Sequence, residues 1–87
     1  MVEQRIRVYG ALGCVDSLRT RRFLDHHRVS YEWIDVDDDA NGLSYVRQVN
    51  QGQRKTPTIV FPDDSILVEP GDVDLARKLV KLGLYSR

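Results

Sequence analysis

The sequence predicts an α/β fold in which a small mixed four-stranded sheet is flanked by helices. Two observations carry this prediction. Short segments with alternating or β-branched residues interchange with longer segments whose apolar residues recur at helical spacing. A Pro-Asp-Asp-Ser run also separates two short apolar segments, as expected of a hairpin turn. The element order is β-α-β-α-β-β-α, with a right-handed crossover unit first and a hairpin plus helix second.

Four segments have the composition of β-strands. The first alternates charged and apolar residues, whereas the others are rich in β-branched or aromatic side chains. Residues 62–65 are predicted to form the tight turn between the last two strands. The predicted strands are residues 5–9, 29–36, 58–61 and 66–68.

The first predicted helix covers residues 15–27. Asp16 lies near its start, where a negative charge complements the helix macrodipole. We expect Leu18, Phe23 and Leu24 to supply its apolar side.

The two remaining helices carry apolar residues three or four positions apart. One covers residues 40–49 and follows aspartates at 37–39, which offer an N-cap. The last is predicted to be capped by Asp72 and to end at Gly83. The residues expected to face the core are Leu43, Val46 and Val49 in the former and Leu75, Leu79 and Leu82 in the latter.

Length and composition limit the possible functions. The chain of 87 residues fits a single domain over residues 1–87. Its 13 basic and 13 acidic residues give zero formal net charge, so we expect neither nucleic acid nor a membrane as partner. Neither a signal peptide nor a membrane-spanning run is recognisable, so a cytoplasmic protein is expected. We also expect the protein to be a monomer.

The single cysteine excludes a disulfide framework and any multi-cysteine metal site within one chain. An acidic run at residues 35–39 could suggest a metal site, but it lacks the glycine and spaced acids of a calcium loop. We interpret that run as a strand end followed by a helix cap, and no metal site is expected.

Cys14 follows the first predicted strand and directly precedes the first helix. The first helical turn has backbone N–H groups without intrahelical partners, and these stabilise a thiolate. We therefore expect a lowered thiol pKa and a nucleophilic sulfur. The alternative is that Cys14 is a small buried hydrophobic residue, as free cysteines often are.

Ser17 lies three residues after Cys14, so the two residues face each other on a first helical turn. The run is a Cys-x-x-Cys frame with serine in the second position. Its hydroxyl can donate a hydrogen bond to the thiolate but cannot form a disulfide with it. An ordinary early-helix serine is the alternative interpretation.

These features together resemble a known family. The element order, the position of Cys14, the Thr56-Pro57-Thr58 sequence before a strand, and the run over residues 49–61 are similar to the glutaredoxin branch of the thioredoxin-like superfamily. The closest resemblance is to mycoredoxins and NrdH-like glutaredoxins, and it covers nearly the whole chain.

The resemblance implies roles for particular positions. Cys14 matches the nucleophilic cysteine, and Ser17 stands where dithiol members have a resolving cysteine. Pro57 matches a cis-proline opposite the nucleophile. Thr56 would present its backbone N–H and C=O to a peptide-like thiol ligand.

The rest of the ligand site is implied in the same way. Gly71 and Asp72 match the last-helix start that binds the ligand's far end, where free N–H groups suit a carboxylate and the Asp72 side chain could accept from a ligand amine. Arg54 and Lys55 are cations suitably placed for a ligand carboxylate. The chain departs from the family in having Leu-Gly before the cysteine, Thr56 before the proline and a single glycine near the last helix.

The function implied is that of a monothiol thiol–disulfide oxidoreductase. It would reduce mixed disulfides between substrate proteins and a low-molecular-weight thiol, with glutathione or mycothiol as co-substrate and no bound cofactor. One alternative is a non-catalytic module that binds a thiol ligand or, as a dimer, an iron–sulfur cluster. Another is a dithiol glutaredoxin or mycoredoxin in which Ser17 replaces the resolving cysteine.

Overall fold

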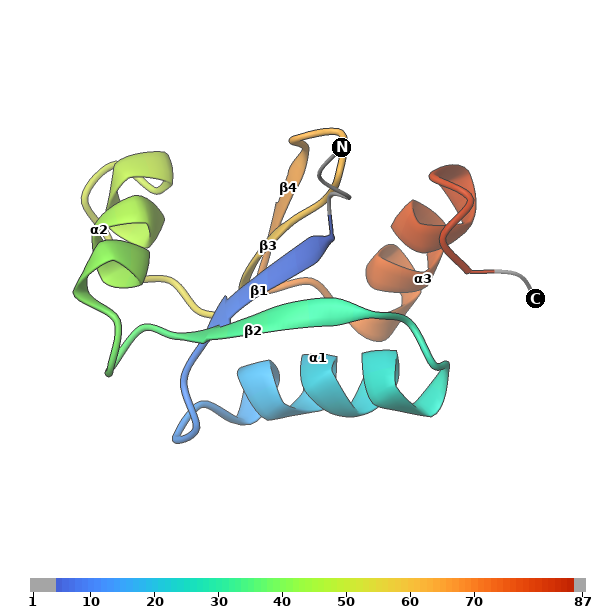
Figure 1. The fold of residues 1–87 in the computed structure, drawn as a ribbon, viewed down its shortest axis with the longest axis horizontal. Helices are drawn as coiled ribbons and strands as arrows, with labels where there is room; N and C mark the ends of the chain where they lie inside the picture. Colours follow the sequence, from blue (N-terminus) through green and yellow to red (C-terminus); the bar gives the residue numbers. More distant parts are fainter. Residues whose placement is uncertain (1–4, 86–87) are drawn as a thin grey trace.

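The computed structural model describes residues 5–85, and its strands and helices follow the predicted order (Figure 1). The ends of the elements differ only slightly from those predicted. The strands are β1 (Ile6–Gly10), β2 (Tyr31–Asp35), β3 (Thr58–Val60) and β4 (Ile66–Val68). The helices are α1 (Val15–His26), α2 (Ala40–Val49) and α3 (Asp72–Lys81).

The strands form one mixed sheet in the order β2-β1-β3-β4. β1 is parallel to β2, because α1 carries the chain back to the end of the sheet at which β1 began, and β1 is antiparallel to β3. The tight turn makes β4 antiparallel to β3. The predicted α/β class, with helices flanking a small mixed sheet, is confirmed.

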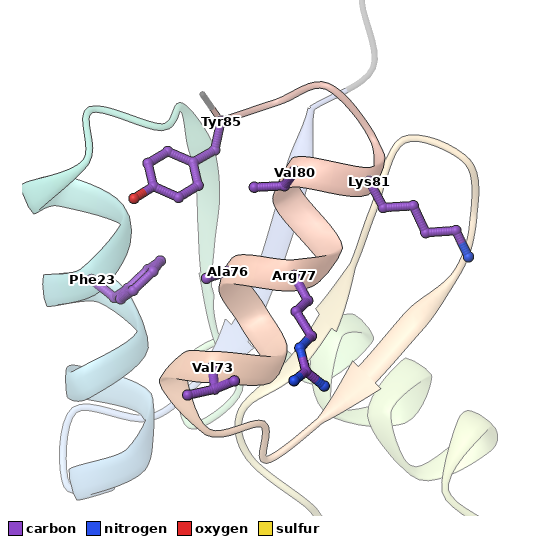
Figure 2. A pocket seen from close by; sticks show the side chains of 7 residues that line it. All are labelled: Phe23, Val73, Ala76, Arg77, Val80, Lys81 and Tyr85. Carbon is purple, nitrogen blue, oxygen red and sulfur yellow. The ribbon is translucent and has the colours of Figure 1, made fainter. Parts of the chain in front are cut away.

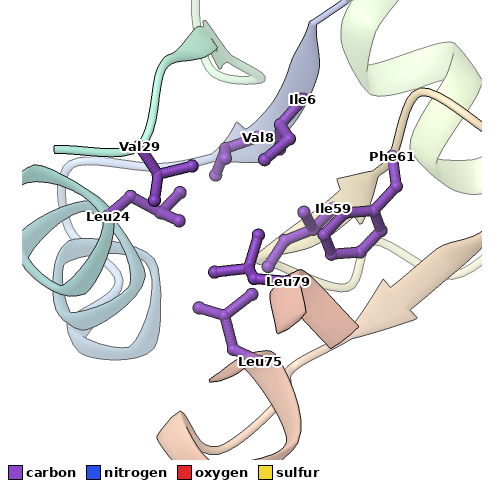
Figure 3. Close-up of a cluster of buried hydrophobic side chains, with 8 residues drawn as sticks. All are labelled: Ile6, Val8, Leu24, Val29, Ile59, Phe61, Leu75 and Leu79. Atoms are coloured by element: carbon purple, nitrogen blue, oxygen red, sulfur yellow. The ribbon is translucent and has the colours of Figure 1, made fainter. Parts of the chain in front are cut away.

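Alternation along β1 divides the core between the two faces of the sheet. Val8 points toward α1 and α3, whereas Tyr9 points toward α2. The larger cluster joins side chains from three strand-region segments to those of two helices (Figure 3). Its buried members are Ile6, Val8, Leu24, Val29, Ile59, Phe61, Leu75 and Leu79.

The inner side of α1 is more polar than predicted. Leu18 was expected in the core, but its side chain is 36% exposed. The buried positions are instead Ser17, Thr20 and Leu24, which lie on one face at helical spacing. Leu18 follows Ser17 by one residue, a rotation of about 100°, and therefore turns away from the sheet.

The helix ends agree with the predicted signals with one exception. Asp39 caps α2 by accepting a hydrogen bond from the Gly42 N–H at 2.9 Å, and Gly83 adopts a left-handed φ of 73° after α3. The prediction that Asp72 caps α3 was wrong. The N-cap is Gly71, whose backbone is extended, and Asp72 is the first helical residue, where its charge still favours the macrodipole.

Carboxylates of the acidic run at residues 35–39 accept hydrogen bonds from nearby backbone N–H groups, in agreement with the interpretation of this run as a strand end followed by a helix cap. The Asp35 carboxylate accepts from the Asp37 N–H at 2.9 Å, and Asp39 is the cap of α2. Within residues 5–85 no group of three or more His, Cys, Asp or Glu side chains could hold a metal ion. No helix in the same part of the chain has the length and apolarity needed to cross a membrane.

Candidate active site

Cys14 is the N-cap residue of α1 and has the extended backbone expected there, with φ −99° and ψ 116°. Its N–H donates to the Ala11 carbonyl at 3.1 Å, and its own carbonyl accepts the first helical bond from Leu18 at 3.1 Å. The side chain is half-buried. The structure therefore confirms the predicted position of the thiol at the positive end of a helix.

The sulfur connects two segments that are 42 residues apart in the chain. The neutral Cys14 thiol donates to the Thr56 carbonyl oxygen at 3.5 Å, which sets the turn after β1 against the loop before β3. Cys14, Thr56 and Pro57 are therefore brought together, as the resemblance implied.

Several donors surround the sulfur and favour its ionised form. Partial burial raises the pKa of the Cys14 thiol, but hydrogen bonds from the side chains of Ser17 and Thr56 and from the N–H groups of Ser17 and Asp16 outweigh burial and lower it below the ordinary value. The Asp16 carboxylate, which could oppose this effect, is paired with Arg19 at 2.8 Å. A larger fraction of Cys14 is therefore thiolate at neutral pH than for a free cysteine.

Ser17 is fully buried beneath Cys14. Its Oγ accepts a hydrogen bond from the Ala11 N–H at 3.3 Å, so the hydroxyl proton remains available to donate to the sulfur. The position of this serine thus supports the expectation that it donates a hydrogen bond to the thiolate. Its buried oxygen has a hydrogen-bond partner in the Ala11 N–H.

The close packing of Gly10 against Ser17 and Trp33 was not identified from the sequence. A Cβ added to Gly10 would lie 2.8 Å from the Ser17 Oγ and 2.6 Å from Trp33 Cη2. The Arg21 guanidinium covers the Trp33 ring, with its carbon 4.4 Å from the ring centroid. The only available signal was a glycine ending β1 immediately before the loop that leads to the cysteine.

The Thr56–Pro57 peptide bond is cis, as the resemblance implied. Pro57 is buried, and its carbonyl accepts from the Glu69 N–H at 2.8 Å. This bond draws the segment that leads into α3 toward the proline loop. Gly71 and Asp72 follow two residues later and are exposed at the start of that helix.

A buried amide supports the proline loop from below. The Asn50 side chain donates to the Val46 carbonyl at 2.8 Å and to the Thr58 Oγ at 3.2 Å. The Thr58 hydroxyl in turn donates to the Lys55 carbonyl at 2.7 Å. Asn50 was placed in a polar loop from the sequence, and its supporting role was missed because a buried asparagine after a helix looks like any loop residue.

The two predicted cationic positions differ in their surroundings. The exposed Arg54 guanidinium is paired with Asp37 at 2.7 Å, so it bridges the proline loop to the loop after β2. Lys55 is half-buried, and its backbone carbonyl is the acceptor for Thr58. A ligand carboxylate at Arg54 would share that guanidinium with Asp37.

Comparison with known proteins places these features in a family. The glutaredoxin family model matches residues 6–66. Two Mycobacterium tuberculosis proteins, from strains CDC 1551 and H37Rv and both provisionally named glutaredoxins, are 30% identical over 82 residues, which is 94% of this chain and 98% of theirs.

Solved structures show the same fold. The crystal structure of the thioredoxin-like protein BC3987 has a TM-score of 0.69 and 28% identity, covering 86% of this chain and 99% of that one. A glutaredoxin from Archaeoglobus fulgidus has a TM-score of 0.70 at 22% identity, with 88% and 86% covered. A buckwheat glutaredoxin–glutathione complex has a TM-score of 0.68 at 20% identity, with 94% and 82% covered.

Proposed function

The chain belongs to the glutaredoxin family, and from that premise we propose that it is a monothiol thiol–disulfide oxidoreductase with Cys14 as nucleophile. The observation that carries the proposal is the sulfur's position as the N-cap of α1, among donors from Ser17 and Thr56. Such an environment supplies a thiolate at neutral pH, which is the species that attacks a disulfide.

The first step begins with a mixed disulfide between a substrate protein and a small thiol. The Cys14 thiolate attacks the sulfur of the small thiol, so a bond forms between these two sulfurs and the original disulfide bond breaks. The substrate protein leaves as a thiolate and takes a proton from solvent. Cys14 is now linked to the small thiol.

The second step requires a thiol from outside the chain. Ser17 occupies the position from which a second cysteine could resolve the intermediate, and an alcohol cannot form a disulfide. A second molecule of small thiol therefore attacks the bound one as its thiolate, releases the Cys14 thiolate and leaves as the symmetrical disulfide. The net reaction converts the modified protein and one small thiol into the free protein thiol and the small disulfide.

The proposed ligand site surrounds the proline loop. The Thr56 backbone pairs with the ligand as a short strand would, and Arg54 and Lys55 face its carboxylate. The start of α3 receives the other end, with the free N–H groups after Gly71 suited to a carboxylate and the Asp72 side chain suited to an amine. A peptide-like thiol such as glutathione fits this arrangement, and the buckwheat glutaredoxin of the same fold, which was crystallised with glutathione, supports it. Mycothiol is the second candidate.

The same mechanism defines the proposed setting. The partners are thiol-modified proteins and the small thiol, and the working unit is one monomeric domain over residues 1–87. Because each turnover consumes a reduced small thiol, the proposed compartment is the reducing cytoplasm.

The test measures removal of glutathione or mycothiol from a modified model protein. The wild type should release the small thiol and Cys14→Ser should not, whereas Ser30→Ala, a change of an exposed serine away from the site, should retain the wild-type rate. Equal rates for wild type and Cys14→Ser would refute the proposal.

A second arm tests the one-thiol mechanism. The wild type should reduce an ordinary protein disulfide poorly, since it lacks a resolving thiol, and Ser17→Cys should gain this activity. Efficient reduction of a protein disulfide by the wild type would contradict the proposed role of Ser17.

A further inference from the structure

A groove of about 570 Å³ runs between α1 and α3, and its lining residues are distinct from those of the candidate site (Figure 2). Phe23 of α1 and Tyr85 form one wall, and α3 forms the other. The α3 residues that line it are Val73, Ala76, Arg77, Val80 and Lys81.

The α3 wall of the groove carries exposed apolar side chains. Val73 is 65% exposed and Val80 is 45% exposed, although both are valines on a helix that buries Leu75 and Leu79 in the core. Val73 and Val80 are seven residues apart, so they lie on one side of α3 about 10 Å from each other. Phe23 faces them from α1 (Figure 2). A continuous exposed apolar strip of this kind is a feature of interaction surfaces.

The rim of the groove is positive. Arg77 and Lys81 are one turn apart on α3, and no carboxylate is among the residues that line the groove. Both cations lie at its outer edge, because they also line a neighbouring hollow together with Glu69 and Asp74. Ion pairs within residues 5–85 involve the arginines at positions 19 and 54, and neither rim cation takes part in one. This local charge contrasts with the zero formal net charge of the chain.

We propose that this α1–α3 groove binds an acidic amphipathic helix of a partner protein. Apolar side chains of that helix would cover Val73, Val80 and Phe23, and its carboxylates would meet Arg77 and Lys81. An amphipathic helix commonly binds in a groove between two other helices. It contacts the groove through its apolar residues at positions i, i+3, i+4 and i+7. The positive rim selects an acidic partner over a basic or neutral one.

The groove is oriented toward the candidate site. α1 and α3 run in the same general direction, and Val73 lies in the first turn of α3 (Figure 2). Cys14 is at the corresponding end of α1. This proposal therefore deepens the proposed function, on which it rests for its substrate class: thiol-modified proteins that carry an acidic amphipathic helix near the modified cysteine.

The binding test uses a synthetic peptide of about three helical turns, with leucine at the i, i+3, i+4 and i+7 positions and glutamate elsewhere. It is titrated into ¹⁵N-labelled Cys14→Ser protein, so that no redox reaction occurs. The largest shifts should fall on Val73, Val80 and Phe23. Replacing the glutamates with glutamines should weaken binding about tenfold at low salt, and added salt should reduce that difference.

Matched charge reversals locate the interaction. Arg77→Glu should weaken binding of the glutamate peptide about tenfold, because a favourable contact becomes a repulsive one. Arg47→Glu makes the same change at an exposed position on α2, across the sheet, and should alter affinity less than about twofold. Val80→Ser should also weaken binding, since the apolar anchor is lost.

Three results would overturn the docking proposal. These are shifts that map away from the groove, equal affinity for the glutamate and glutamine peptides, and groove shifts that appear with protein concentration alone, which would assign the groove to a second copy of the chain. Turnover of a small modified thiol substrate separates the two proposals. If the wild type binds the glutamate peptide but does not turn over the small substrate, the proposed chemistry is refuted. If the wild type turns over the small substrate but does not bind the peptide, the docking surface is refuted.

Discussion

Gly10 is the position where the smallest possible enlargement should have the clearest effect. A methyl group there would meet the Trp33 ring at 2.6 and 2.7 Å and the Ser17 Oγ at 2.8 Å. Carbon atoms prefer separations of about 3.5–4.0 Å, so each neighbour must retreat by roughly 1 Å. Gly10 cannot retreat instead, because it pairs with Asp35 in the sheet and its carbonyl accepts from the Val36 N–H at 3.0 Å.

The expected cost of Gly10→Ala is that of overpacking a closely fitted site. Such changes usually lower the free energy of unfolding by about 1–3 kcal/mol. In a domain of this size each kcal/mol corresponds to roughly 4–8 °C in Tm, so a loss of about 2 kcal/mol predicts a fall of roughly 8–16 °C. Displacement of the Ser17 hydroxyl should also make the Cys14 thiol less acidic.

Urea unfolding followed by far-UV circular dichroism measures this cost. The matched control is Gly13→Ala, because a Cβ at Gly13 meets no heavy atom within 4 Å. That control should leave the free energy of unfolding unchanged or raise it slightly, since alanine restricts the unfolded chain.

A double-mutant cycle then assigns the cost to the Trp33 ring. In the Trp33→Leu background, Gly10→Ala should cost at least about 1 kcal/mol less than in the wild type, because the ring is no longer there to be displaced. The reasoning is refuted if Gly10→Ala changes stability by less than about 0.5 kcal/mol. It is also refuted if the cost is the same with and without the tryptophan.

Four further predictions concern the sulfur, the proline loop and the core. Ser17→Ala removes a donor and should raise the pKa of Cys14, measured by thiolate absorbance against pH. Because folding lowers the pKa of Cys14, the unfolded chain binds more protons between the two values. The Cys14 thiolate should therefore add to the free energy of unfolding of the wild type, relative to Cys14→Ser. This contribution should grow with pH across that interval, be complete above the unfolded-state pKa, and be lost as pH falls through the folded-state pKa. Asn50→Ala should cost about 1–3 kcal/mol in urea unfolding through the loss of two buried hydrogen bonds, and a cost below about 0.5 kcal/mol would contradict its supporting role. Leu79→Ala should cost about 2–5 kcal/mol by the same measurement, whereas Leu84→Ala, at a residue 36% exposed, should cost much less; equal losses would refute the assigned core.

The order of the elements could be predicted from the sequence because each element carries its own local signal. Alternation in β1, the aspartates before α2 and the spacing of Leu75 and Leu79 in α3 depend only on neighbouring residues. Leu18 was misplaced because residue type suggested burial, whereas the rotation of α1 is decided by packing against the sheet, which buries Ser17 and Thr20 instead.

The candidate site was predictable only in part for a similar reason. Cys14 and Ser17 are close in sequence, so a helical turn is sufficient to relate them. The approach of the Thr56 carbonyl to the sulfur spans 42 residues and was inferred from family resemblance. The packing of Gly10 against Trp33 depends on strand register, and no local pattern reports it.

The position of Cys14 as N-cap has a consequence for the motion of α1. The usual capping residues accept hydrogen bonds from the first N–H groups, but the neutral Cys14 thiol provides no such cap. Its thiolate accepts from the N–H groups of Asp16 and Ser17, so ionisation supplies the missing cap. When the sulfur is alkylated or held in a disulfide, that charge is gone and the first turn of the helix should fray more readily. Amide hydrogen exchange at Asp16 and Ser17 should therefore follow the chemical state of the sulfur, slow in the thiolate and faster in the disulfide.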